Sequence, residues 1–360
     1  MASFDRRSTR TVYVGGIGIG ADCPISIQSM TNTDTHDIDA TYDQVMRLSE
    51  AGCDIVRITA PDLESVKTFE ALISRGVRTP LVADIHFNHE IAVAAAESGV
   101  SKIRINPGNI GDDAKVGRVV EACKKASVPI RIGVNSGSLE KHILEKYGSP
   151  TPEALAESAL YHASLLERFD FFDTVLSVKA SNVPDMIRAN RILAERTRYP
   201  LHLGVTEAGG GTSAIVKSSI GIGALLSEGI GDTVRVSLTD DPVEEIHAAK
   251  EILRSLGLAR DPGLDIVSCP TCGRTKIDLI RLLAEFKERV RLEGLDKLNI
   301  KVALMGCVVN GPGEAREAEL GIAGGNGEGL LFRHGKIIRK VDEDKLIDAL
   351  IEEMKNEYKK

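Results

Sequence analysis

The fold is decided by residues 81–135, which read LVADIHFNHEIAVAAAESGVSKIRINPGNIGDDAKVGRVVEACKKASVPIRIGVN. Short β-branched runs at 81–85, 102–106 and 130–134 alternate in this stretch with polar turns and amphipathic helical segments. An apolar run of a few residues followed by a segment of helical period indicates a buried parallel strand and its crossover helix. We therefore expect three consecutive strands of a parallel sheet.

The same unit recurs from residue 25 to residue 256. Further strands are predicted at 25–30, 54–58, 174–179, 201–206 and 232–237, with helices such as 40–51, 62–75, 151–168, 184–197 and 242–256. Eight strands alternating with helices over about 230 residues match an α/β fold of the (β/α)8 TIM-barrel type. A doubly wound open sheet is the rival fold, but such sheets usually have fewer strands. Residues 9–20 are expected to form a β-hairpin that closes the barrel floor.

A second, smaller domain is predicted after the barrel. Residues 257–264, GLARDPGL, combine Gly, Asp-Pro and Pro-Gly and are typical of a linker. The predicted organisation is a barrel over 1–256, this linker, and a small α+β domain over 265–360. Within that domain we expect strands at 264–268 and 300–304, helices at 275–292 and 342–357, and a hairpin at 330–341.

Composition excludes several classes of protein. The chain has 360 residues, of which 42% are hydrophobic and 27% are charged, as in ordinary globular proteins. Its net charge of −7, from 45 Lys and Arg against 52 Asp and Glu, argues against a nucleic-acid partner. No run approaches the ~18 apolar residues of a membrane helix, and the N-terminus lacks the apolar core of a signal peptide. We expect a soluble cytoplasmic protein without membrane contact.

Cations gather at the predicted carboxyl ends of the barrel strands, where TIM barrels carry their active sites. They are Arg57, Arg104, Arg131, Lys179 and Arg235, and the same strand ends carry Asp84, Asn135, Glu207 and Ser237. Two carboxylates cannot neutralise five cations, and Arg and Lys are the usual partners of phosphate oxygens. We expect a ligand with more than one phosphate group. The rival interpretation is that these cations form structural ion pairs with Asp84, Glu207 or similar groups.

Two nearby motifs are weaker evidence for a binding site. Gly209, Gly210 and Gly211 precede a predicted helix, whose free N–H groups would suit a phosphate, although a flexible turn would also need glycines. His86 and His89 have a spacing that allows a metal site. We expect a polar orienting role or capping of the next helix instead, because a third ligand is missing nearby.

Three of the six cysteines stand in turns that suggest chemistry. Cys269 and Cys272 form a CPTC turn, and Cys307 lies in MGCVVNGPGE, residues 305–314. Zinc, a redox dithiol and an iron–sulfur cluster compete for this site. A [4Fe–4S] cluster with three cysteines and one weaker ligand fits best, and the fourth ligand could be a carboxylate at residues 310–314. A phosphate-binding barrel with such a cluster suggests reductive removal of a hydroxyl group from a phosphorylated small molecule.

Seven motifs together resemble those of the GcpE family, the two-domain bacterial 4-hydroxy-3-methylbut-2-enyl diphosphate synthases. They are SIQSMTNTDT (26–35), ADIHFN (83–88), KIRINPGNIG (102–111), IRIGVNSGSL (130–139), LHLGVTEAG (201–209), SCPTCGR (268–274) and MGCVVNGPGE (305–314). The resemblance implies reductive ring opening and dehydration of 2-C-methyl-D-erythritol 2,4-cyclodiphosphate to (E)-4-hydroxy-3-methylbut-2-enyl diphosphate. This step belongs to the methylerythritol phosphate route to isoprenoids.

The resemblance also implies roles for individual residues and partners. A [4Fe–4S] cluster would be held by Cys269, Cys272, Cys307 and Glu314. The diphosphate would be bound by Arg57, Arg104, Arg131, Lys179 and Arg235, with Asn135 and Ser237, and Glu207 would assist proton transfer. Reduced flavodoxin or ferredoxin would supply electrons, and the cluster domain of one subunit would cap the barrel of the other in a homodimer.

Two other functions remain as alternatives at this point. A Schiff-base aldolase could use Lys179 at the end of its strand. A non-enzymatic iron–sulfur sensor or RNA-binding protein is the third hypothesis, and the absence of a broad basic face argues against it.

Overall fold

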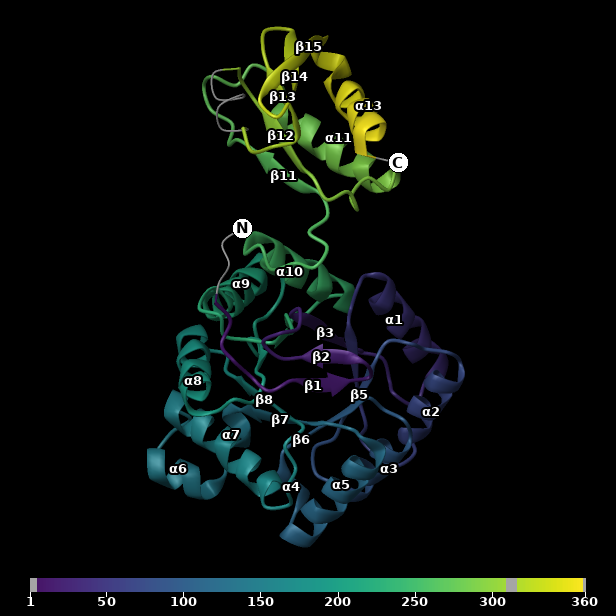
Figure 1. Cartoon of the computed structure of the whole chain (residues 1–360), viewed down its shortest axis with the longest axis vertical. Coiled ribbons are helices and arrows are strands. Elements are labelled where there is room, and N and C mark those ends of the chain that lie inside the picture. The colour runs from purple at the N-terminus through teal and green to yellow at the C-terminus, as the bar shows by residue number, and fades with distance from the viewer. Residues whose placement is uncertain (1–4, 309–315, 359–360) are drawn as a thin grey trace. The chain divides into compact units, whose positions relative to one another are not determined.

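The computed structural model describes residues 5–308 and 316–358. The chain divides into two compact units, Met1–Ala259 and Arg260–Lys360. The first is built on an eight-stranded parallel sheet and the second on a mixed five-stranded sheet (Figure 1). Among the described residues, no helix has both the length and the apolar character that crossing a bilayer requires.

Eight parallel strands form the wall of the first unit. Around the wall they run β8 (Thr174–Lys179), β7 (Ile130–Asn135), β6 (Lys102–Ile105), β5 (Leu81–Asp84), β4 (Ile55–Thr59), β3 (Ser26–Met30), β10 (Thr233–Val234) and β9 (His202–Leu203). A parallel bridge between Leu176 of β8 and Leu201, just before β9, joins the two ends of this order. The predicted TIM barrel is confirmed.

The last two barrel strands are shorter than predicted. Strands were expected over 201–206 and 232–237, whereas β9 and β10 each have two residues. Beyond them the pairing continues through single bonds, such as Arg235 N to Leu203 O at 2.9 Å and Thr206 N to Ala180 O at 3.3 Å. At Gly204 a Cβ would lie 2.6 Å from the carbonyl oxygen of Arg235 and 2.9 Å from Lys179 Nζ. The backbone at this point therefore leaves room for a functional side chain.

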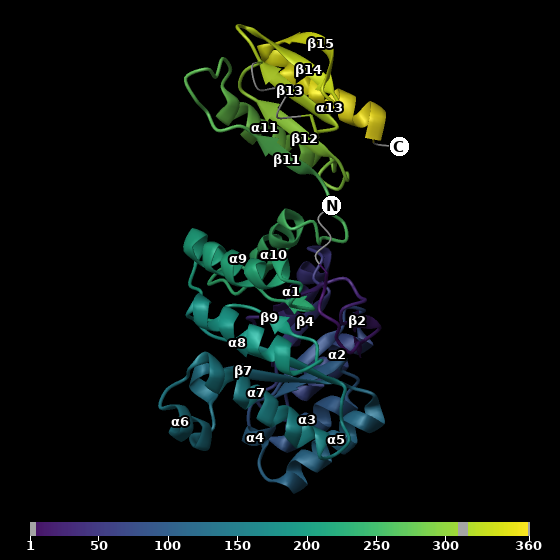
Figure 2. The ribbon, with the colours of Figure 1, turned by 60° about the vertical axis from the view of Figure 1, so that its left-hand side comes forward.

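A ring of helices surrounds the barrel (Figures 1 and 2). It consists of α1 (Ile38–Glu50), α2 (Val66–Ser74), α3 (His89–Glu97), α5 (Asp113–Ala126), α7 (Pro152–Glu167), α8 (Val183–Arg196), α9 (Gly211–Ser227) and α10 (Pro242–Ser255). Short helices α4 (Pro107–Ile110) and α6 (Lys141–Tyr147) and the 3₁₀ turn η1 (Ser136–Ser138) were not predicted and lie in the loops after β6 and β7. Apolar side chains of the ring and of the outer strand faces form one large core.

The barrel floor is closed by a hairpin, as predicted for residues 9–20. Strands β1 (Val12–Val14) and β2 (Ile17–Ile19) pair antiparallel. Val14 and Ile19 pack against Ile55 and Val82, which lie at the amino ends of β4 and β5. Because this end is filled with apolar side chains, the open end is the one formed by the carboxyl ends of the strands.

The second unit is a mixed sheet with two long helices. The sheet order is β11 (Asp265–Ser268), β12 (Lys301–Met305), β13 (Leu320–Gly324), β14 (Glu328–Arg333) and β15 (Lys336–Asp342). The first three strands are parallel, and β14 and β15 are antiparallel to their neighbours. Helices α11 (Leu279–Leu292) and α13 (Leu346–Tyr358), the latter preceded by the 3₁₀ turn η2 (Glu343–Lys345), contribute Phe286 and Leu350 to a separate core.

Three details of this unit differ from the prediction, and the first is that helix α13 starts at Leu346 rather than 342. Helix α11 starts at Leu279 rather than 275, because the Asp278 side chain caps it by accepting from Arg281 N. Strand β13 was missed, since its sequence LGIAG resembles a glycine-rich loop. At Gly321 a Cβ would lie 2.3 Å from Cζ of Phe332, so the strand needs glycine there to accommodate the aromatic ring.

Candidate active site

A small cavity of about 120 Å³ lies at the carboxyl ends of the barrel strands. It is lined by Arg57, Asp84, His86, Arg104, Arg131, Gly133, Asn135, Ser177, Lys179, Thr206, Arg235 and Ser237. We call it the cationic cavity. The structure brings together in its wall all five predicted cations, together with Asn135 and Ser237.

The alternation of strand β7 explains how these side chains reach the interior. Ile130, Ile132 and Val134 belong to the core between strands and helices, so Arg131, Gly133 and Asn135 face the other way. Arg131 lies beside Arg104 of β6 in the register, and Asn135 lies beside Lys179 of β8.

Glycine 133 makes the space for one guanidinium group. A Cβ at Gly133 would lie 2.4 Å from Arg104 Nε. The Gly133 carbonyl also accepts a hydrogen bond of 2.8 Å from Arg104 Nη2. The same residue therefore both admits Arg104 and holds it.

Asp84 is the counter-charge of two cations. Its Oδ1 lies 3.2 Å from Arg104 Nη1, and its Oδ2 lies 3.6 Å from Arg57 Nε. Burial by itself would raise the pKa of Asp84, but the positive charges of Arg57, Arg104 and Arg131 outweigh it and lower the pKa to about 2. Asp84 is therefore an anion that orients two of the five cations.

The second counter-charge is Glu245 of α10, which the sequence analysis did not single out. Its carboxylate receives Arg235 Nη2 at 2.9 Å and Arg235 Nε at 3.2 Å. The suggested structural partners were Asp84, Glu207 or similar groups; Asp84 is one of the two partners found, and the other is Glu245 instead of Glu207. A glutamate among the apolar positions Ile246, Ala249 and Leu253 of a helix was the signal that could have revealed it.

Arg131 and Lys179 have no carboxylate partner among the ion pairs of residues 5–308 and 316–358. Arg131 donates to Gln28 Oε1 at 3.3 Å, and both cations are almost fully buried. Burial, and then the neighbouring cations, hold the pKa of each well below its ordinary value. A bound anion would remove this electrostatic cost, so these two residues mark where an anionic group is most needed.

Glu207 lies outside the wall of the cationic cavity. It is exposed, and its φ of +53° places it in the left-handed region, which a glutamate rarely adopts. The preceding residue, Thr206, does line the cavity. The structure thus places Glu207 next to the cavity wall but not in it.

The glycine-rich helix start predicted to bind a phosphate does not line the cationic cavity. Helix α9 begins at Gly211 with Gly210 as its N-cap, and no side chain caps it. Gly209, Gly210 and Gly211 are absent from the wall of the cationic cavity. Gly211 instead lines a hollow of about 430 Å³ between α9 and α10.

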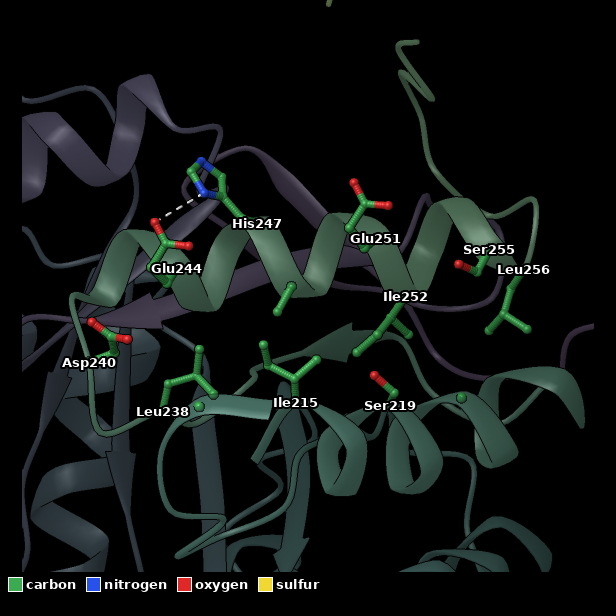
Figure 3. Close-up of a pocket in the computed structure, with 13 residues that line it drawn as sticks. Ile215, Ser219, Leu238, Asp240, Glu244, His247, Glu251, Ile252, Ser255 and Leu256 are labelled. Atoms are coloured by element: carbon green, nitrogen blue, oxygen red, sulfur yellow. Dashed lines mark ion pairs between the residues drawn. The ribbon is translucent and has the colours of Figure 1, made fainter. Parts of the chain in front are cut away.

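That hollow has a different chemical character. In Figure 3 the side chains of Ile215, Leu238 and Ile252 lie between the two helices, and the His247–Glu244 ion pair of 3.4 Å lies along α10. Its wall carries acidic and apolar residues and no Arg or Lys. It is therefore unsuited to a diphosphate.

The two histidines behave differently from each other. His86 lines the cationic cavity, which fits a polar orienting role. His89 contacts Arg118 at 3.2 Å, while Asn88 caps α3 by accepting from Glu90 N. The capping expected of this segment is thus performed by Asn88.

The three predicted cluster cysteines line one pocket of about 190 Å³ in the second unit. The wall consists of Cys269, Pro270, Cys272, Arg274, Thr275, Met305 and Cys307. The cysteines follow β11 and β12, which are neighbouring parallel strands, so the topology brings the two turns together. Glu314, the predicted fourth ligand, lies outside the described residues.

The side chains and backbone groups of the pocket are of the kinds that bind an iron–sulfur cluster. It offers three thiols, and Gly306 N–H donates to Cys269 Sγ at 3.2 Å, the kind of bond that tunes cluster thiolates. The nearby backbone N–H of Arg274 is the largest influence that lowers the pKa of Cys272. Within the part of the chain that the structure describes, no three His, Cys, Asp or Glu side chains converge closely enough to hold a metal ion.

Both units match the two domains of one known family. The GcpE TIM-barrel domain matches residues 9–250, and the GcpE protein C-terminal domain matches residues 265–356. The two matches together cover most of the chain, in the same order as the two structural units.

Two relatives of similar sequence agree with this assignment. A 4-hydroxy-3-methylbut-2-en-1-yl diphosphate synthase (flavodoxin) from Clostridium perfringens is 58% identical over 97% of this chain and 98% of its own length. Its counterpart from Fusobacterium nucleatum is 56% identical over 96% of both chains. Among solved structures, the dihydropteroate synthase of Yersinia pestis has a TM-score of 0.48 and 13% identity, covering 69% of this chain and 100% of that one.

Proposed function

The chain belongs to the GcpE family and has its 4-hydroxy-3-methylbut-2-en-1-yl diphosphate synthase activity, and we propose that the cationic cavity binds the cyclic diphosphate substrate. The activity belongs to the methylerythritol phosphate route to isoprenoids. The observation that carries the proposal is the convergence of five buried or nearly buried cations on a cavity with two counter-carboxylates. The excess over the two carboxylates is three positive charges, and the negative charges of two phosphates would offset most of it.

The cations divide into two groups in this proposal. Arg131 and Lys179, which lack a carboxylate partner, contact the phosphates most directly. Arg57, Arg104 and Arg235 are already oriented by Asp84 or Glu245 and meet the ligand with little loss of side-chain entropy. Asn135 and Ser237 supply hydrogen bonds from the same wall.

We assign Cys269, Cys272 and Cys307 as ligands of a [4Fe–4S] cluster, with Glu314 as the fourth ligand and a second catalytic residue. A cluster of this kind supplies single electrons and a Lewis-acidic iron, which suits the two-electron removal of a hydroxyl group. The names of the relatives specify flavodoxin, so reduced flavodoxin is the proposed donor, with ferredoxin as the alternative. The protein would work in the cytoplasm, where such carriers are kept reduced.

Glu207 is the proposed proton donor. Its exposed position beside Thr206 allows it to collect a proton from solvent and pass it toward the leaving hydroxyl group. Its left-handed backbone is the sort of strain that functional sites retain.

We propose that the barrel domain spans residues 1–256, the linker residues 257–264 and the cluster domain residues 265–360. A homodimer in which each cluster domain caps the partner's barrel would exclude water from the reaction. The Schiff-base aldolase and the non-enzymatic sensor are set aside, because the family is an oxidoreductase.

The test uses protein purified without oxygen. Iron and sulfide content, absorbance and EPR are measured first, followed by turnover of the cyclic diphosphate with a chemical reductant. About four irons and four sulfides per chain, with product formed, is the expected result. Zinc in place of iron, with no turnover after cluster reconstitution, would contradict the cluster assignment.

A further inference from the structure

We propose that Glu245 is a positioning residue for the reaction, which holds the Arg235 guanidinium in the orientation that binds a substrate phosphate. The proposal rests on the function proposed for the cationic cavity. Glu245 lies on α10, outside the cavity wall, and its side chain is 3% exposed. It lies outside the wall, so it acts through the groups it holds, and Arg235 is the one whose side chain lines the cavity.

The carboxylate of Glu245 accepts four hydrogen bonds. Oε1 accepts from Arg235 Nη2 at 2.9 Å and from Leu238 N at 3.2 Å. Oε2 accepts from Arg235 Nε at 3.2 Å and from Ser29 Oγ at 2.7 Å. Every bond that the buried anion needs is thus supplied by donors of this chain.

The two bonds to Arg235 fix the plane of its guanidinium group. Nε and Nη2 form one edge of the group, and both of their bonds go to the same carboxylate. The group cannot rotate about its long axis without breaking one of them. The side of Arg235 that lines the cationic cavity is thereby presented to the ligand in one orientation.

The other two bonds connect this orientation to the frame of the barrel. Ser29 belongs to β3, and Leu238 follows the strand end that carries Ser237, another residue of the cavity wall. Glu245 therefore sets the position of Arg235 and of the adjoining backbone together. Asp84 holds Arg57 and Arg104 in a comparable way from within the wall.

A purely structural role predicts a different response to mutation. Glu245→Gln keeps the size of the side chain, but its amide N–H₂ would face an N–H donor of Arg235. If Glu245 acts through Arg235, this variant raises the KM for the cyclic diphosphate roughly tenfold with kcat little changed, because binding is lost equally in ground and transition states. If the role is structural, thermal stability falls and KM does not change.

Ser29→Ala is the matched control. It removes one hydrogen bond from the same carboxylate and leaves both Arg235 contacts in place. We expect a KM rise clearly smaller than that of Glu245→Gln, because Leu238 N and both Arg235 nitrogens still hold the carboxylate. A KM rise equal to that of Glu245→Gln would overturn the positioning role, since loss of any bond to the carboxylate would then have the same effect.

The decisive experiment compares the KM values of the single and double variants of the reconstituted holoenzyme and asks whether their effects add. Iron content and melting temperature are recorded for each variant. Arg235→Ala should raise KM, and the double variant Glu245→Gln/Arg235→Ala should be no worse than Arg235→Ala alone. Additive effects would overturn the inference while leaving the proposed function in place. An unchanged KM in Arg235→Ala would overturn both.

A second variant covers the case in which Glu245→Gln does not fold. Glu245→Asp keeps the charge but is one methylene shorter, so it cannot span both Arg235 nitrogens with the same geometry. We expect a smaller KM rise that disappears in the Arg235→Ala background. An unchanged KM in Glu245→Asp would count against the proposal.

Discussion

At the scale of single residues, Asp84 links the site to stability. Its pKa of about 2 in the folded chain lies below the ordinary value of 3.8, so the unfolded chain binds the proton more tightly. The resulting stabilisation, about 2 kcal/mol, is present above pH 3.8 and is lost as the pH falls toward 2. We expect Asp84→Asn to flatten the unfolding free energy between pH 4 and pH 2, measured by urea denaturation. An equally steep fall in the variant would contradict this.

Lys179 is a cationic group whose proton binding should depend on the ligand. In the free protein, burial and the neighbouring Arg235, Arg57 and Arg131 lower the pKa of its amine, while Glu245 opposes them more weakly. A bound diphosphate favours the ammonium form and raises this pKa again, so binding should take up protons at a pH between the pKa of free Lys179 and that of the complex. Calorimetric titration with inorganic diphosphate, in buffers of different ionisation enthalpy, measures the number taken up. The uptake should fall in Lys179→Met, and equal uptake in both proteins would refute the assignment.

Cys53 and Cys123 are predicted to be unreactive toward alkylating reagents in the native protein. Both thiols are buried, and burial raises the pKa of each to about 12. In the native protein neither should react with iodoacetamide at neutral pH, which peptide mass analysis can establish. Rapid modification of either residue would show that its surroundings open readily.

At the scale of elements, the bounds of a strand could be predicted from the sequence where one of its faces packs in the core and sets the hydrophobic pattern. The strands β3 to β8 follow the predicted ranges closely, because their β-branched residues face the helices. The strand ends also gave the cations, since side chains at the carboxyl ends of barrel strands share one opening. Glu245 was not assigned in this way, because it lies on a helix and not at a strand end, and its partner Ser29 is 216 residues away in the chain.

Strand β13 shows why the second unit was harder to predict. Its glycines indicate a loop locally, but Gly321 is required by the tertiary contact with Phe332. We expect Gly321→Ala to destabilise this unit by about 1–3 kcal/mol through overpacking, measured by thermal unfolding. Gly137→Ala, where a Cβ has no neighbour within 4 Å, is the control and should have little effect. Equal melting temperatures for the two variants would show that the strand can move aside.

At the scale of the whole molecule, the residues proposed for the two chemical tasks lie in different units. All five cations of the cationic cavity belong to Met1–Ala259, and the three cysteines belong to Arg260–Lys360. Each unit has its own apolar core. Loss of the proposed cluster should therefore abolish the electron transfer without dismantling the proposed phosphate site.

The variant that tests this separation replaces Cys269, Cys272 and Cys307 with serine in the full chain. It should bind no iron and form no product, yet bind the cyclic diphosphate within about fivefold of the cluster-loaded protein, or ~1 kcal/mol. Calorimetry of both proteins under anaerobic conditions supplies the comparison. A much larger loss of affinity would mean that the cluster unit contributes directly to substrate binding. The excess positive charge of the barrel would then be an incomplete account of recognition.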